Sequence, residues 1–207
     1  MRVLVACEFS GRVREAFRQE GHEAWSCDLL PAEDDSEWHI QGDALFAANN
    51  WNYWTFAPWD LLIAPPPCTY LSVSGLHWNK RQPERAEKTE EAIEFVRAIL
   101  ALPITKIALE NPVGCLSTVV RKPDQIIQPY EFGEDASKKT CLWLKNLPLL
   151  IPTKLIQPRL VDGKPRWSNQ TDSGQNKLGP SEGRWKERSR TYPGIARAMA
   201  QQWGRIG

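Results

Sequence analysis

Residues 2–31 read RVLVACEFSGRVREAFRQEGHEAWSCDLLP, the pattern of a strand, a turn, a helix and a second strand. The apolar run at residues 3–7 predicts a buried strand, and Ser10 with Gly11 predicts a turn. An amphipathic helix is expected to about Glu20, and residues 24–28 predict the next strand. This opening indicates an α/β fold, because parallel strands need a crossover between them, usually a helix.

Three more strands and two more helices follow. We expect strands at residues 60–64, 106–111 and 140–145, and helices at 83–102 and in the closing segment 194–204. The helix at 83–102 is supported by apolar residues at i, i+3, i+4, i+7 and i+8 spacing. Alternating strands and helices predict a Rossmann-like, mostly parallel sheet with helices on both faces.

The composition is typical of one globular domain. The 207 residues are 42% hydrophobic, which suits a single core and is too little chain for two large ones. The net charge of +1 provides no overall attraction to nucleic acid, so a polyanion would have to bind a local patch. No apolar run approaches the roughly 18 to 20 residues that span a bilayer. We therefore expect a cytoplasmic protein without membrane contact.

The cysteines do not form a metal-binding or disulfide pattern. There are five, they are widely spaced, and no CxxC motif occurs. This spacing predicts reduced thiols and no metal site.

Polar residues follow four of the predicted strands. Glu8 to Gly11 follow the first strand, Asp28 ends the second, Pro65–Cys68 follow the strand at 60–64, and Glu110 with Asn111 end the strand at 106–111. In open α/β sheets the ligand binds outside the carboxyl ends of the strands. We expect these residues to converge on one crevice.

Cys68 and Glu110 could form a reactive pair in that crevice. A thiolate is a strong nucleophile, and three prolines before Cys68 would restrict the directions in which its sulfur can point. A carboxyl group beside it could hydrogen-bond or protonate a heterocycle while the thiolate adds to it. Taken singly, a cysteine such as Cys68 is more often a buried structural thiol, and Glu110 could equally be a cap at the end of a strand.

The ordered motifs resemble those of the cytosine-5 DNA methyltransferases. These motifs are EFSG, an acid ending the second strand, GD, PPPC, ENP and the terminal YPGIARAMAQQW, and Cys68 precedes Glu110 by 42 residues. The resemblance covers nearly the whole chain in order. It implies S-adenosylmethionine as the cofactor and cytosine in DNA as the substrate.

The resemblance also implies a role for each motif. Cys68 would add to carbon 6 of cytosine, while Glu110 would engage ring N3 and the exocyclic amine. The residues implied to contact the cofactor are Phe9, Ser10, Gly11, Asp28, Asp43, Pro65 and Tyr192, with Phe9 on the adenine ring, Asp28 on the ribose hydroxyls and Asp43 on the adenine amine. The residues implied to contact the substrate are Pro67, Asn111, Lys138, Lys139, Arg188 and Arg190.

The sequence departs from that family in two places. Arg12 and Val13 stand where the cofactor loop usually has further glycines. Only the segment 146–190 occupies the place of a target-recognition domain, and residues 154–190 contain nine basic and four acidic residues. This basic segment could hold phosphates without reading the base sequence.

Because segment 146–190 is short for a target-recognition domain, three hypotheses remain open. The chain could be one catalytic domain that methylates DNA, with a homodimer or a partner protein supplying target recognition. It could be a carbon-5 modifying enzyme that acts on a pyrimidine nucleotide. It could also be a non-catalytic relative that binds nucleic acid or protein.

Overall fold

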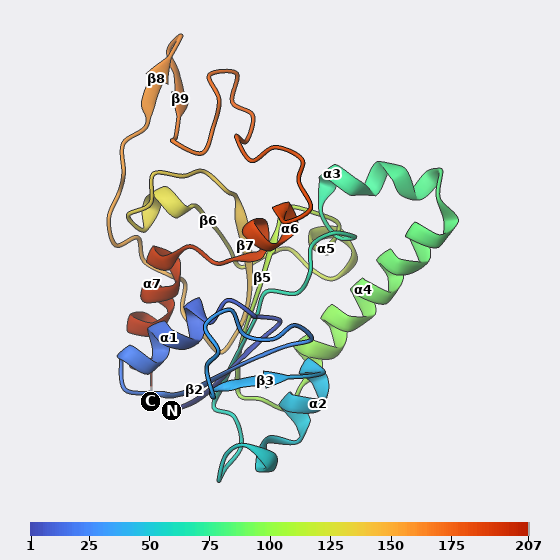
Figure 1. Ribbon diagram of the computed structural model, residues 1–207, viewed down its shortest axis with the longest axis vertical. Coiled ribbons are helices and arrows are strands. Elements are labelled where there is room, and N and C mark those ends of the chain that lie inside the picture. The colour runs from blue at the N-terminus through green and yellow to red at the C-terminus, as the bar shows by residue number, and fades with distance from the viewer. Residues whose placement is uncertain (207) are drawn as a thin grey trace.

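The computed structural model describes residues 1–206, except for the side chain of Ser74, and its centre is a seven-stranded sheet with helices on both faces (Figure 1). The strands of this sheet are β1 (Arg2–Ala6), β2 (Glu23–Asp28), β3 (His39–Gln41), β4 (Leu61–Ala64), β5 (Lys106–Pro112), β6 (Gln125–Ile127) and β7 (Thr140–Lys145). The helices are α1 (Arg12–Gln19), α2 (Ala44–Asn49), α3 (Val73–Leu76), α4 (Pro83–Ala101), α5 (Leu116–Val119), α6 (Arg184–Ser189) and α7 (Pro193–Trp203). A separate hairpin consists of β8 (Arg159–Val161) and β9 (Lys164–Arg166).

The sheet is mostly parallel. Its strand order is β3-β2-β1-β4-β5-β7-β6. The pairs β1–β2, β1–β4, β2–β3 and β4–β5 are parallel, whereas β7 runs antiparallel to both of its neighbours. The predicted α/β class and the mostly parallel sheet are therefore confirmed.

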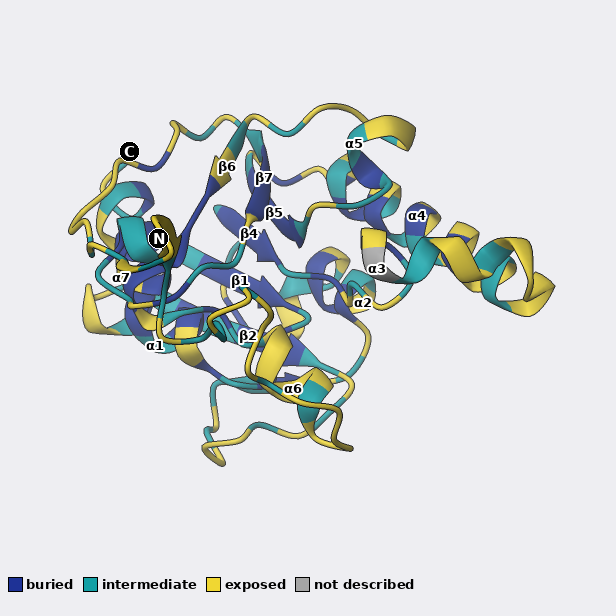
Figure 2. Ribbon diagram, turned by 90° about the horizontal axis from the view of Figure 1, so that it is seen from above, coloured by how far each residue is buried: buried dark blue, intermediate teal, exposed yellow. Residues whose placement is uncertain are grey.

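Alternate residues of β1 face two separate hydrophobic layers. Val3 and Val5 pack with the buried side chains of α1 and α7, whereas Leu4 and Ala6 pack with those of α2 and α4. Figure 2 shows α1 and α7 on one side of the sheet and α2 and α4 on the other. Because both faces of β1 are covered, its sequence is a continuous apolar run rather than an alternation.

The predicted strands and helices agree with the structure to within about one residue at each end. The elements that were not predicted are short. Strands β3 and β6 have three residues each and α2 has six, which is too little chain for a periodic pattern to stand out. They extend the sheet at its two edges and cover one face of it.

Helix α4 is the longest helix, and only part of it is covered by the sheet. Its buried residues are Thr89, Ile93, Val96 and Ile99, so the first turn and a half carry no buried side chain. Figure 2 shows this exposed end projecting from the molecule. No helix within residues 1–206 is long and apolar enough to cross a membrane.

The segment predicted as a basic loop contains regular structure. Hairpin β8–β9 turns at Asp162 and Gly163, which both have positive φ angles of 50° and 72°. Asp-Gly is a strong hairpin signal, and it was present in the sequence. The ring of Trp167 stacks on Tyr130 at 4.4 Å, which fixes the base of the projecting hairpin seen in Figure 1.

Candidate functional site

The carboxyl ends of four parallel strands open into one cavity of about 1240 Å³. Cys7 follows β1, Asp28 ends β2, Pro65 follows β4 and Glu110 lies near the end of β5, and all four line this cavity. Strands that run in the same direction bring their final residues to one edge of the sheet. The fold therefore brings together residues that lie far apart in the sequence.

Most of the predicted site residues line this cavity, and four do not. Those that line it are Phe9, Asp28, Pro65, Pro67, Cys68, Glu110, Asn111, Lys138, Arg188, Arg190 and Tyr192. Those outside the lining are Ser10, Gly11, Asp43 and Lys139. Gly11 has a φ of 67° at the start of α1, a conformation that glycine adopts without strain. The carboxylate of Asp43 caps α2 by accepting a hydrogen bond from the Phe46 N–H at 2.7 Å.

The loop after β4 presents Cys68 at the start of a turn. The Leu71 and Ser72 N–H groups donate to the Cys68 carbonyl oxygen at 3.1 and 3.0 Å. The preceding prolines have no N–H, so this chain cannot extend the ladder beyond β4. Cys68 is half-buried and faces the cavity that Glu110 also lines.

Residues at the end of β5 and just after it hold this loop from one side. The Asn111 Nδ2 atom donates to the Pro66 carbonyl oxygen at 2.9 Å, and the Cys115 N–H donates to the Leu71 carbonyl at the same distance. Asn111 is 1% exposed, and its Oδ1 atom has no hydrogen-bond partner among the described residues. The loop after β4 and the end of β5 therefore form one unit.

Glu110 is 8% exposed and has a hydroxyl partner. Its Oε2 atom accepts a hydrogen bond from Thr191 Oγ1 at 3.3 Å. Thr191 directly precedes Tyr192, which begins the terminal YPGIARAMAQQW motif. We did not predict a role for Thr191, because no local pattern indicates contact between residues that are 81 positions apart.

The part of the cavity next to β1 and β2 contains an aromatic pair and a carboxylate. The Phe9 and Trp185 ring centroids are 6.2 Å apart. Asp28 Oδ1 accepts a hydrogen bond from the Leu30 N–H at 3.0 Å, and burial raises the pKa of Asp28 above its usual value. Trp185 belongs to α6, which lies far from Phe9 in the sequence, so the sequence pattern could not predict this contact.

The N-terminus of α1 already holds a carboxylate from the protein itself. Glu8 accepts hydrogen bonds from the Val13 and Arg14 N–H groups at 2.7 and 3.1 Å. Burial raises the pKa of Glu8 to about 7, although these two hydrogen bonds oppose the shift. Arg12 instead lines the cavity, with its Nη1 atom donating to the Thr191 carbonyl at 3.2 Å.

Two of the predicted substrate-binding cations have partners within the protein. Arg190 forms ion pairs with Glu33, in the loop after β2, and with Glu187 in α6. Lys138 Nζ donates to the carbonyl of Arg188 at 3.0 Å. These contacts hold the segment around α6 against the cavity, whereas Lys139 is exposed.

Solved structures with this fold include proteins described as methyltransferases. One is a prophage-encoded E. coli protein assigned as a DNA modification methyltransferase, with a TM-score of 0.50, 15% identity, and alignment over 78% of this chain and 53% of that chain. Another is a mutant of Spodoptera frugiperda DNMT2, with a TM-score of 0.46, 14% identity, and alignment over 80% of this chain and 57% of that chain. The sequence matches no protein-family model and no curated protein.

The chain spans little more than half the length of these two proteins. At this low identity the likeness concerns the fold. It confirms the predicted Rossmann-like methyltransferase fold, built here on the seven-stranded sheet.

Proposed function

We propose that this protein is an S-adenosylmethionine-dependent methyltransferase that methylates carbon 5 of cytosine in DNA. The observation that carries the proposal is that Cys68, in the loop after β4, and Glu110, near the end of the neighbouring parallel strand β5, line one cavity. Phe9 and Asp28 line the same cavity after β1 and β2. A nucleophile, an acid and a nucleoside-binding edge are thus combined in one crevice.

The residues of the cofactor side suit S-adenosylmethionine. The cavity of about 1240 Å³ is larger than the common range of about 300 to 1,000 Å³ for small-molecule pockets, so it has room for two ligands. Phe9 would contact the adenine ring, and Asp28 would accept hydrogen bonds from the ribose hydroxyls. Because Glu8 occupies two N–H groups of α1, Arg12 is the group we expect to hold the carboxylate of the cofactor. When bound, this cofactor supplies an electrophilic methyl group.

Cys68 and Glu110 would perform the chemistry on the ring. The Cys68 thiolate forms a bond to carbon 6, and the electrons of the ring double bond move so that carbon 5 becomes nucleophilic. Glu110 hydrogen-bonds or protonates ring N3 and so accommodates the added charge. Carbon 5 would take the methyl group, and S-adenosylhomocysteine would be the leaving product. Carbon 5 would then lose its proton to water, the electrons of that C–H bond would re-form the ring double bond, and the sulfur–carbon bond would break to release the Cys68 thiolate. A cytosine in duplex DNA must first leave the base stack.

We propose that residues 1–207 form one catalytic domain, in which residues 146–190 take the place of a target-recognition domain. Hairpin β8–β9 and helix α6 are the only helical or strand elements in the described part of that segment. We therefore expect phosphate contacts from its basic residues and little base reading, unless a second copy or a partner protein contributes.

Methyl transfer from labelled cofactor tests the proposal. Duplex DNA, single-stranded DNA and deoxycytidine monophosphate would be offered in parallel, and label on the DNA is the expected result. Cys68→Ser should abolish the transfer, whereas Cys115→Ser, in the neighbouring loop, should retain it. With the cofactor present, DNA containing 5-fluorocytosine should form a denaturation-resistant complex with the wild-type protein and with Cys115→Ser but not with Cys68→Ser, because fluorine prevents the proton loss that frees Cys68. Transfer that survives Cys68→Ser would rule out the covalent mechanism, and label on the mononucleotide alone would rule out DNA as the substrate.

A further inference from the structure

The exposed start of α4 contacts the loop that carries Cys68. Arg85 Nη2 donates to the Thr69 carbonyl oxygen at 2.7 Å, and Arg85 Nε donates to the Gly75 carbonyl oxygen at 3.2 Å. One guanidinium group therefore joins both ends of the turn that follows Cys68. Arginine can do this because its donors are held in a rigid planar fork.

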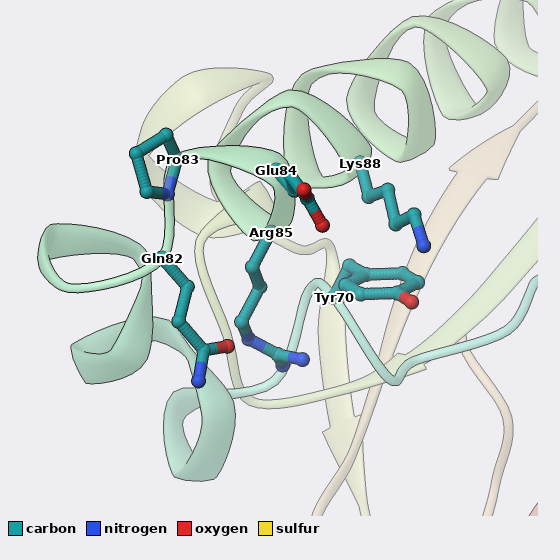
Figure 3. Close-up of a pocket in the computed structure, with 6 residues that line it drawn as sticks. All are labelled: Tyr70, Gln82, Pro83, Glu84, Arg85 and Lys88. Atoms are coloured by element: carbon teal, nitrogen blue, oxygen red, sulfur yellow. The ribbon is translucent and has the colours of Figure 1, made fainter.

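The loop is shaped around this guanidinium group. A Cβ atom at Gly75 would overlap Arg85 Nη2, so the absence of a side chain there leaves room for the contact. The Arg85 guanidinium carbon also lies 4.9 Å from the ring centroid of Tyr70. Figure 3 shows Arg85 reaching from α4 beside the Tyr70 ring, where both residues line a groove of about 460 Å³.

A second contact from α4 lies about one turn further on. Thr89 is 4% exposed, and its hydroxyl group shares its hydrogen between the carbonyls of Tyr70 and Arg85 at 3.2 and 3.0 Å. Asn79 Nδ2 donates to the same hydroxyl at 2.9 Å. The loop is thus held by α4 on one side.

The opposite side of the loop is held by the chain after β5. Ser72 forms an antiparallel bridge with Gly114, and the Val73 N–H donates to the Val113 carbonyl at 3.3 Å. The turn that begins at the Cys68 carbonyl is therefore fixed between two rigid elements. Arg85 donates two hydrogen bonds to this turn from a charged side chain.

We propose that Arg85 is a positioning residue, which sets the direction of the Cys68 thiol by closing the turn between Thr69 and Gly75. The proposal rests on the proposed function, in which the thiolate must reach carbon 6 of a bound ring. Arg85 also lines the cavity that contains Cys68. Both of its hydrogen bonds go to the loop backbone, so it acts through the loop and does not take part in the bond changes. Misplacement of a reacting atom by about 1 Å can lower a rate about 100-fold.

Three variants separate positioning from general effects of charge or folding. Arg85→Ala removes both hydrogen bonds, and Arg85→Lys keeps the charge but lacks the fork. Lys88→Ala is the matched control, because Lys88 lies on the same helix and lines the same groove, and has no hydrogen bond to the turn among the described residues. Circular dichroism and thermal unfolding would establish that each variant is folded.

We expect Arg85→Ala to lower kcat about 10- to 100-fold with KM within about twofold, since the residues proposed to bind the cofactor and the substrate remain in place. Arg85→Lys should recover part of that loss, and Lys88→Ala should retain the wild-type kcat. Amide hydrogen exchange across residues 69–76 should be about tenfold faster in Arg85→Ala and unchanged elsewhere in the sheet. If Arg85→Ala does not fold, kcat and amide exchange of Arg85→Lys are compared with those of Lys88→Ala instead.

The rate at which iodoacetamide alkylates Cys68, measured by peptide mass spectrometry, tests the proposal even if the protein shows no methyl transfer. A loosened turn should raise this rate about threefold or more in Arg85→Ala. The wild-type protein could show no methyl transfer while Arg85→Ala still speeds up Cys68 alkylation and amide exchange. That result would refute the proposed function but support the role of Arg85 in setting the direction of the thiol. An unchanged alkylation rate and unchanged exchange, or an active Arg85→Ala variant with wild-type kcat, would overturn the proposal.

Discussion

The side-chain amide of Asn111, at the end of β5, donates a hydrogen bond to the carbonyl oxygen of Pro66 at 2.9 Å. Pro66 precedes Cys68 by two residues, and Asn111 directly follows Glu110. This contact therefore couples the two chain segments that carry the proposed nucleophile and the proposed acid. Since both residues are buried, the hydrogen bond is shielded from competing water.

Asn111→Ala should weaken both stability and turnover. Loss of the amide leaves the buried Pro66 carbonyl without this donor, which costs about 1 to 3 kcal/mol. We expect the urea midpoint to fall and kcat for methyl transfer to fall more than KM rises. Asn49→Ala is the control, because Asn49 also donates its amide to a carbonyl, that of Leu45, but at an exposed site. Equal effects of the two substitutions would contradict the coupling.

Thr191→Val should lower activity without unfolding the protein. Valine has nearly the shape of threonine and lacks the hydroxyl group that donates to Glu110 at 3.3 Å. We expect kcat to fall about three- to tenfold, since one intramolecular hydrogen bond is worth about 0.5 to 1.5 kcal/mol. Thr191→Ser keeps the hydroxyl and should retain most of the activity. A Thr191→Val variant with full kcat would show that this hydroxyl does not support Glu110 in the reaction.

The main features of the sheet could be predicted from sequence, because buried strands and amphipathic helices leave periodic patterns. Cys68 and Glu110 were predicted to lie near each other by the same reasoning, since Cys68 follows one recognisable strand, Glu110 lies at the end of another, and parallel strands end at one edge. Cys68 and Glu110 line the same cavity because β4 and β5 are neighbours in the sheet, and the conformation of the loops matters less. Strand order is a rule of the fold class, so it can be inferred from alternation.

Contacts between loops could not be predicted in this way. Thr191 meets Glu110, and Arg85 meets Thr69 and Gly75, only because tertiary packing brings their segments together. Hydrogen bonds from side chains to loop carbonyls leave no periodicity in the sequence. Glu8 was seen as a strand-end residue, but its capping of α1 depends on the exact turn at Gly11.

Glu8 should make the stability of the protein depend on pH. Its pKa is raised by burial from 4.5 to about 7, so the folded protein holds this proton more tightly than the unfolded chain. The resulting stabilisation is complete below about pH 4.5 and is lost as the pH rises through about 7. One pKa unit corresponds to about 1.4 kcal/mol, so the contribution amounts to about 3 kcal/mol.

Glu8→Gln removes this titration and keeps an oxygen acceptor for the Val13 N–H. We expect the difference in unfolding free energy between Glu8→Gln and the wild type to shift in favour of the variant by about 3 kcal/mol from pH 4.5 to pH 8. Urea unfolding at each pH measures this difference, and other titrating groups cancel because both proteins contain them. Parallel stability curves would show that Glu8 titrates alike in the folded and unfolded chains.

Gly114→Ala should disturb the Cys68 loop through packing alone. A Cβ atom at Gly114 would overlap the carbonyl group of Leu71 and crowd the Cα atom of Ser72, and these are backbone atoms that cannot rotate away. The loop must therefore shift, at a cost of about 1 to 3 kcal/mol in unfolding free energy. Because the displaced turn begins at Cys68, methyl transfer should fall together with stability.

Gly42→Ala separates this steric effect from the general effect of replacing glycine. A Cβ atom at Gly42 would meet no atom within 4 Å, so the substitution mainly restricts the unfolded chain and should leave stability equal or raise it by up to about 1 kcal/mol. Urea unfolding of both variants gives the comparison. If Gly114→Ala were as stable as Gly42→Ala, the loop would be free to move away from Gly114. The bridge between Ser72 and Gly114 would then not hold Cys68 in place, and the fixing of the thiol would depend on Asn111 and on the contacts from α4.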